Sequence, residues 1–127
     1  MWDMTSPDGK IKVIRRSLGN PGASRDFGGA IEIPGTTFRV SERFFCDPMV
    51  FSGDSRFLAA AESFSDDPSY DNSSRAVVFD FEKQKEIIVY TEKRGGITTL
   101  QWTSGSLRIG AHSSLHGASE HVWKPAS

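Results

Sequence analysis

One stretch of the sequence decides the fold class: Ala76-Val77-Val78-Phe79-Asp80-Phe81, followed by Glu82-Lys83-Gln84-Lys85 and then by Glu86-Ile87-Ile88-Val89-Tyr90-Thr91. Its two outer runs are rich in β-branched and aromatic residues, which favour strands. Side chains alternate along an extended strand, so Val77 and Phe79 are expected on one face. The four residues between the runs are polar and suit a turn. The stretch therefore predicts an antiparallel hairpin.

Similar runs recur along the chain, and Gly, Pro, Asp or Ser separates most of them. They are Lys10–Arg16, Ala30–Ile33, Thr37–Ser41, Met49–Ser52, Arg56–Ser63, Ile97–Thr103, Leu107–Ala111 and Glu120–Lys124. The best helical candidate is Phe57–Phe64, which contains three alanines, but it is short and follows a turn. We predict a strand there as well, because no longer stretch has convincing helical periodicity. The chain is therefore predicted to be all-β.

Length and composition predict one domain covering residues 1–127 of the 127-residue chain. The formal net charge is −1, and lysines and arginines are spread along the sequence. Nucleic acid and anionic membranes need clustered cations, so neither is expected as a partner. Cys46 is the single cysteine, which rules out an internal disulfide. We find no basic leader followed by an apolar run, and no apolar stretch of about 20 residues, so the predicted location is cytoplasmic.

A turn motif recurs in the sequence. Ser6-Pro7-Asp8-Gly9 aligns with Ser52-Gly53-Asp54-Ser55, and Trp102–Leu107 provides a shortened third copy. Pro presets φ at the second turn position, and Asp and Gly suit a tight reversal. Each copy has the order strand, turn, strand, long loop, hairpin, although the third copy stops early. We therefore expect three repeats, at roughly residues 1–47, 48–96 and 97–127.

This order resembles the blade of WD40-like and TolB-like β-propellers, which carry a Ser-Pro-Asp-Gly-type turn between their first two strands. Phe79-Asp80 and Val122-Trp123 stand where such blades place a Trp-Asp-like pair. The resemblance implies about three antiparallel blade-like sheets. Propellers typically close with four to eight blades, so three copies imply an incomplete, propeller-like arrangement. A β-sandwich is the alternative architecture.

The repeat also predicts where binding residues lie. Three long segments, Ser17–Gly29, Ser65–Ser74 and His112–Ser119, take the same place in each repeat and are expected on one face, opposite the short turns. Long loops on a rigid scaffold are where binding concentrates. Charged and aromatic residues on this face are the predicted partner contacts. They are Arg25, Asp26, Arg43, Phe45, Asp66, Asp67, Tyr70, Asp71, Arg94 and His116.

Catalytic and metal signals are weak. Three convergent imidazoles can bind zinc, but the spacing of His112, His116 and His121 does not force convergence. The acidic second loop departs from the EF-hand pattern and suits a basic partner instead. The sequence has no Gly-x-Ser-x-Gly elbow and no P-loop ending. We therefore predict no catalytic residue, no metal and no cofactor.

A small domain with long loops on one face and no catalytic signature resembles the immunity proteins that bacteria encode beside polymorphic toxins. The resemblance implies a cytoplasmic, non-enzymatic inhibitor that binds and neutralises a cognate toxin or effector domain. One alternative is a small-ligand-binding or metal-dependent enzyme domain that uses the same long-loop face. Its candidates are His112, His116, His121, Asp66 and Asp67. Another is a structural subunit of a larger β assembly, for which exposed sheet edges would be needed.

Overall fold

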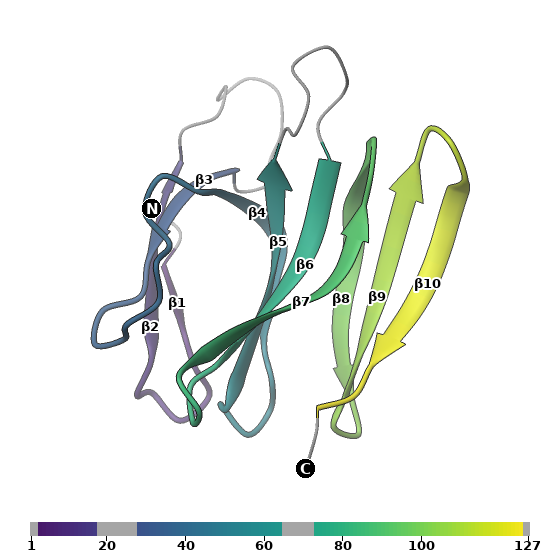
Figure 1. Cartoon of the computed structure of the whole chain (residues 1–127). Helices are drawn as coiled ribbons and strands as arrows, with labels where there is room; N and C mark the ends of the chain where they lie inside the picture. The colour runs from purple at the N-terminus through teal and green to yellow at the C-terminus, as the bar shows by residue number, and fades with distance from the viewer. Residues whose placement is uncertain (1–2, 18–27, 65–72, 126–127) are drawn as a thin grey trace.

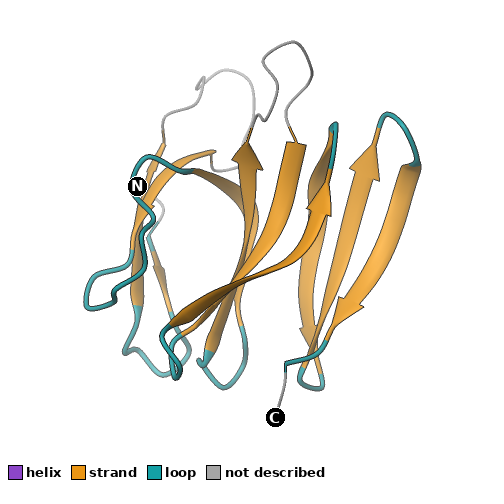
Figure 2. Cartoon of the chain, viewed as in Figure 1, coloured by secondary structure: helices purple, strands orange, loops and turns teal. Residues whose placement is uncertain are grey.

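The computed structural model describes residues 3–17, 28–64 and 73–125, and these residues form ten strands and no helix (Figure 2). The strands are β1 (Met4–Thr5), β2 (Lys12–Ser17), β3 (Gly28–Glu32), β4 (Phe44–Phe51), β5 (Phe57–Phe64), β6 (Ser73–Asp80), β7 (Lys85–Glu92), β8 (Gly95–Thr103), β9 (Ser106–Ser113) and β10 (Gly117–Trp123). The predicted all-β fold is confirmed. The best helical candidate is strand β5. Within the described ranges, no helix is long and apolar enough to cross a membrane.

The strands form two antiparallel sheets. Strands β1 to β7 pair in chain order in one seven-stranded sheet, and the second sheet has the order β10-β9-β8 (Figure 1). The larger sheet curves strongly from β1 and β2 round to β6 and β7 (Figure 1). Strand β8 packs over β4, β5 and β6, and β9 lies near β7. The result is a two-layer arrangement that agrees with the alternative prediction, a β-sandwich.

The prediction of three blade-like repeats is wrong. Its boundary at residues 47–48 falls inside β4, and its boundary at 96–97 falls inside β8. Strand β4 pairs with both β3 and β5, so the first two predicted repeats belong to one continuous sheet. The third predicted repeat differs at its turn, because Ser104 and Gly105 alone join β8 to β9 with φ of 49° and 81°. This is the two-residue geometry that hairpins favour.

The turn motif itself does recur. The hydroxyls of Ser6 and Ser52 donate to the carboxylates of Asp8 and Asp54 at 2.6 and 2.7 Å. Each hydroxyl also accepts the backbone N–H five residues further on, at 3.0 Å. The two turns touch, because the backbone N–H of Asp8 donates to Ser55 Oγ at 2.9 Å. The sequence alignment therefore detected a local hairpin geometry and not a repeated sheet.

The core has two parts, one on each face of the larger sheet. The part on the inner side of the curve contains Val13, Ile31, Ile33, Val40, Phe45, Met49, Leu58, Ala60, Val77 and Phe79. The part between the sheets contains Phe57, Ala59, Ala61, Ala76, Val78, Ile97, Leu100, Leu107, Ile109 and Ala111. Because β5 and β6 are covered on both faces, they have near-continuous apolar runs. Each fully buried large side chain stabilises the fold by about 1.5–3 kcal/mol.

Thr37–Ser41 is not a strand, which corrects the prediction for that run. It lies in the link between β3 and β4. Phe38 and Val40 pack against the inner core, and the Phe38 ring meets Phe79 edge to face at 5.0 Å between centroids. The alternation of the run therefore reflects side chains that cover the curved sheet, without pairing of the backbone.

Candidate binding site

Two adjoining cavities open between the sheets, at the end of the molecule where the β4–β5, β6–β7 and β8–β9 turns lie (Figure 1). The larger has a volume of about 470 Å³ and the smaller about 190 Å³. Arg56, Phe57 and Pro125 line both of them. We call the two cavities together the inter-sheet cleft. Another depression of about 470 Å³ is lined, among the described residues, by Asp47, Pro48, Ile97 and Thr98, none of which is aromatic.

Three rings from three strands form the aromatic floor of the inter-sheet cleft: Phe57, Trp102 and Trp123. Phe57 stacks on Trp102 at 5.5 Å with an interplanar angle of 17°, and it meets Trp123 edge to face at 5.9 Å. The indole N–H of Trp102 donates to the carbonyl of Val50 at 3.1 Å, which fixes that ring. Phe57 is buried, and both tryptophans are half-buried. The aromatic floor is therefore rigid, large in area and partly open to solvent.

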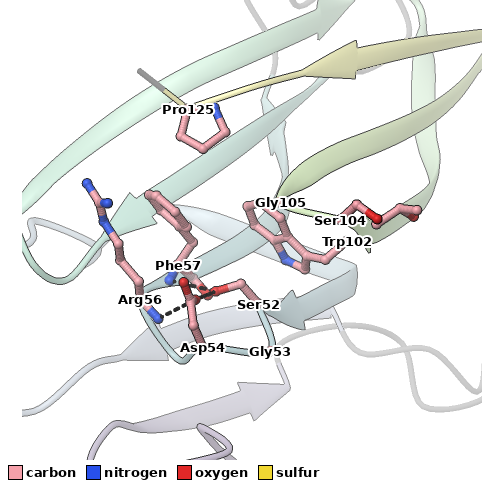
Figure 3. Close-up of a pocket in the computed structure, with 10 residues that line it drawn as sticks. Ser52, Gly53, Asp54, Arg56, Phe57, Trp102, Ser104, Gly105 and Pro125 are labelled. Carbon is pink, nitrogen blue, oxygen red and sulfur yellow. Dashed lines mark hydrogen bonds between the residues drawn. The ribbon is translucent and has the colours of Figure 1, made fainter. Parts of the chain in front are cut away.

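Arg56 is held at the wall of the inter-sheet cleft. Its guanidinium donates two hydrogen bonds to the Asp80 carboxylate, at 3.2 and 3.1 Å, and stands 4.7 Å from the centre of the Phe57 ring. Figure 3 shows Phe57 between Arg56 and Trp102, with Pro125 across the cavity. Burial raises the pKa of Asp80, but the bonds from Arg56 and from two backbone N–H groups outweigh it and lower the pKa below the usual value. The pair is thus ionised and pre-positioned.

Three exposed lysines form the lysine rim: Lys83, Lys85 and Lys124. None of them makes an ion pair with any residue in the described part of the chain. Together with Arg56 they line the smaller cavity, where Asp80 is the one carboxylate among the described lining residues, and the exposed Glu82 pairs with Arg56 at 3.6 Å. Positive charge is thus concentrated here, although the formal net charge of the whole chain is −1. The lysine rim therefore attracts anionic groups to the aromatic floor.

Two of the three turns that the sequence aligned as repeats line the larger cavity. Ser52-Gly53-Asp54 comes from the β4–β5 turn and Ser104-Gly105 from the β8–β9 turn. The hydrogen bond from the Ser52 hydroxyl and the backbone N–H of Arg56 lower the pKa of the Asp54 carboxyl. An ionised Asp54 keeps this turn closed. Two turns thought to lie in separate blades thus lie beside one cavity.

Two predicted contacts, Arg94 and His116, lie at the opposite end from the inter-sheet cleft, in the β7–β8 and β9–β10 turns (Figure 1). The structure brings these turns together. The backbone N–H of Arg94 donates to Ser73 Oγ at 3.1 Å, and the backbone N–H of Ser114 donates to the Arg94 carbonyl at 3.3 Å. His116 is exposed. Arg94 is half-buried. Two of the predicted contacts therefore lie at the same end of the described structure.

Arg43 has a structural position. Its guanidinium donates two hydrogen bonds to Glu62 and two to Glu86, all between 2.7 and 2.9 Å. Arg75 donates to the same Glu62 at 2.8 Å. The Glu62 side chain is only 4% exposed. We call these four side chains the ionic cluster. It ties the β3–β4 link to β5, β6 and β7, so Arg43 holds the fold together where the sequence predicted a partner contact.

Phe45 is fully buried in the inner core, and this corrects its prediction as a partner contact. The neighbouring Phe44 is 38% exposed. Adjacent residues in a strand point to opposite faces of the sheet, so the two phenylalanines cannot both face the core. The structure places Phe45 inside and Phe44 outside, because Phe45 packs against Phe79 at 6.0 Å between ring centroids.

Several other predicted contacts lie outside the described residues. They are Arg25, Asp26, Asp66, Asp67, Tyr70 and Asp71. The segment His112–Ser119 is not a long loop, which corrects that prediction: β9 runs to Ser113 and β10 begins at Gly117. The three histidines do not converge, and His121 stacks on Tyr90 at 3.9 Å between ring centroids. In residues 3–17, 28–64 and 73–125, no group of three or more His, Cys, Asp or Glu side chains is placed to hold a metal ion.

No protein-family model matches the chain, and comparison with curated proteins gives no match. The resemblance to propeller blades therefore fails in the sheet topology and finds no support in these comparisons. The likeness to immunity proteins likewise receives no support as a family assignment.

Proposed function

We propose that this chain is a protein-binding module without catalytic activity and that the inter-sheet cleft is its binding site. The observation that carries the proposal is the aromatic floor lying directly beside three lysines that lack described ion-pair partners. Aromatic side chains and arginine are the residues that dominate binding energy at protein interfaces. The inter-sheet cleft offers both types, with Arg56 stacked on Phe57.

The rigidity of the inter-sheet cleft supports this proposal. Trp102 is fixed by its hydrogen bond to Val50, and Arg56 by its two bonds to Asp80. A site whose side chains are already ordered loses less conformational entropy when a partner binds. The lysine rim adds long-range attraction, which raises the rate of association with an acidic partner. The aromatic floor would supply affinity, and the lysine rim would supply selectivity.

Toxin neutralisation in the cytoplasm is a narrower form of the same proposal. In that form the acidic surface of a toxin or effector domain would occupy the inter-sheet cleft, and occupation would block its active site. This differs from the sequence prediction, which placed the partner on the long-loop face. Growth of cells that co-express the identified partner with this chain would test the narrower form: rescue supports it, and continued toxicity contradicts it.

Capture from native cells tests the broader proposal. The full chain is compared with a Lys85→Glu, Lys124→Glu double variant and with Lys10→Glu, an exposed charge reversal at the β1–β2 turn. A partner identified with the wild-type chain is then purified and its affinity measured for each variant. We expect the double variant to bind about tenfold more weakly and Lys10→Glu to bind normally. Equal affinity for all three proteins, or no saturable partner, would contradict the proposal.

A further inference from the structure

The two sheets have four edges, formed by β1 and β7 in the larger sheet and by β8 and β10 in the smaller. A sheet edge exposes unpaired backbone N–H and C=O groups, which can pair with another chain. Proteins block such pairing by keeping edge strands short or by introducing bulges. Comparing the four edges shows which one is open to a partner strand.

Three of the four edges are blocked in this way. Strand β1 has two residues. Strand β7 carries a bulge at Val89, because Ala76 pairs with Tyr90 while Val77 pairs with Ile88. Strand β8 carries one at Thr98, since the register shifts between Ile97 and Thr99. A short strand and two bulged strands make poor templates for a regular ladder.

Strand β10 is the exception. Its seven residues, from Gly117 to Trp123, pair with β9 without any register shift. No strand in the described part of the chain pairs with its other edge. The strand contains neither proline nor lysine, the residues that commonly protect edges. Its one charged residue, Glu120, is exposed and forms an ion pair with Arg108 of the neighbouring strand β9. Its outward-facing Val122 is 57% exposed. This edge is therefore long and regular.

The open edge leads to the inter-sheet cleft. Trp123, the last residue of β10, belongs to the aromatic floor, and Lys124 follows it directly. Lys83 and Lys85 line the same small cavity as Lys124. A strand laid along β10 and continued past Trp123 would thus bring its side chains to all three lysines of the lysine rim.

We infer that an extended, acidic segment of a partner protein adds to the smaller sheet as a fourth strand, beside β10, with carboxylates against the lysine rim. The inference rests on the proposed function and specifies the chemistry of its partner. In this mode of recognition, backbone hydrogen bonds supply affinity and alternate side chains supply specificity. The lysine rim provides the charge complementarity that selects acidic sequences.

A second copy of this chain fits the edge less well. Two-fold antiparallel pairing over the whole of β10 would place Glu120 directly opposite its own copy. Like charges in directly opposed positions destabilise a strand pair. A single-stranded nucleic acid could contact the rings and the lysines, but it would leave the backbone of β10 unpaired. An extended acidic segment can pair with the backbone of β10 and also place carboxylates against the lysine rim.

Selection from a displayed library of random segments of about ten residues, enough to span β10, tests the inference. We expect enrichment of sequences that combine β-branched residues with Asp and Glu. The best segment should slow amide hydrogen exchange across Gly117–Trp123. Methylating its backbone nitrogens on the pairing side should abolish binding while the side chains stay the same. Lys85→Glu with Lys124→Glu should weaken binding about tenfold, and Lys10→Glu should have no effect.

The inference would be overturned by a lack of acidic enrichment, by equal binding of the methylated segment, or by exchange protection outside β10. Concentration-dependent dimerisation through β10, or tighter binding of a single-stranded oligonucleotide than of any segment, would also overturn it. The proposed function has a separate outcome. If a captured protein partner depends on the lysine rim but leaves exchange in β10 unchanged, the inter-sheet cleft is the site and strand addition is wrong.

Discussion

Glu62→Gln removes the central charge of the ionic cluster while preserving the shape of the side chain. In the wild-type chain the Glu62 carboxylate accepts two hydrogen bonds from Arg43 and one from Arg75. Burial raises the pKa of Glu62, but these bonds lower it by more, so the group is ionised in the folded protein. The substitution leaves two guanidinium groups facing a neutral amide.

The size of the stability loss in Glu62→Gln follows from how deeply the charged groups are buried. Removing one member of a buried ion pair costs about 3–5 kcal/mol when its partner stays buried and uncompensated. Here the side chains of Arg43 and Arg75 are 20% and 29% exposed, and Glu86 still pairs with Arg43. Water and Glu86 therefore offset part of the loss. We expect the free energy of unfolding to fall by about 2–3 kcal/mol.

Urea unfolding followed by tryptophan fluorescence measures this loss, because Trp102 and Trp123 pack between the sheets. The midpoint should fall by roughly 1 M. The control is Glu32→Gln, whose carboxylate pairs with Arg16 at 3.2 Å but is 54% exposed. The control should change stability by less than about 0.5 kcal/mol. Equal effects of the two substitutions would refute the structural role given to the ionic cluster.

Two further predictions concern pH and packing. The pKa values of Glu62 and Asp80 in the folded protein lie below their usual values of 4.5 and 3.8. Both carboxylates therefore stabilise the fold above the usual pKa values, and this stabilisation is lost as the pH falls through the lowered pKa values of the folded state. Urea midpoints should be constant from about pH 7 to 5 and fall below about pH 4.5, and a constant midpoint down to about pH 3 would contradict this. Gly95→Ala should lower the free energy of unfolding by about 1–3 kcal/mol, because the new Cβ would lie 2.2 Å from the His112 carbonyl oxygen. Gly96→Ala should leave the stability nearly unchanged, because a Cβ at this position would have no atom within 4 Å. Thermal unfolding of both glycine variants gives the comparison, and equal melting temperatures would show the close approach to be unimportant.

The sequence was a good guide to local structure. The hairpin from Ala76 to Thr91 forms, as β6 and β7, because β-branched residues and a polar turn specify it locally. The sequence failed where pairing between distant segments decides the sheet. In the described part of the chain, two residue pairs join β3 and β4: Gly28 with Cys46 and Gly29 with Phe45. Nothing in these residues marks that pairing, and it is what makes β1 to β7 one sheet.

The inter-sheet cleft could not be predicted for a related reason. Phe57 belongs to one sheet, and Trp102 and Trp123 belong to the other. The contact between these rings depends on how the two sheets pack against each other. The hydrophobic periodicity of the sequence does not show that packing. Both tryptophans are half-buried and pack against the part of the core between the sheets. One sequence signal did point to the cleft: the alignment of the turns at Ser52 and Ser104. In the structure both of these turns line the larger cavity.

Site-specific photocrosslinking in native cells tests the inter-sheet cleft most directly. A photoreactive residue replaces the exposed Ser104, which lines the cleft, and in a matched variant it replaces the exposed His112 on β9, outside it. We expect a discrete crosslinked protein partner from position 104 and none from position 112. A partner captured at position 112 alone, or no crosslink at position 104, would contradict the claim that the inter-sheet cleft is the binding site.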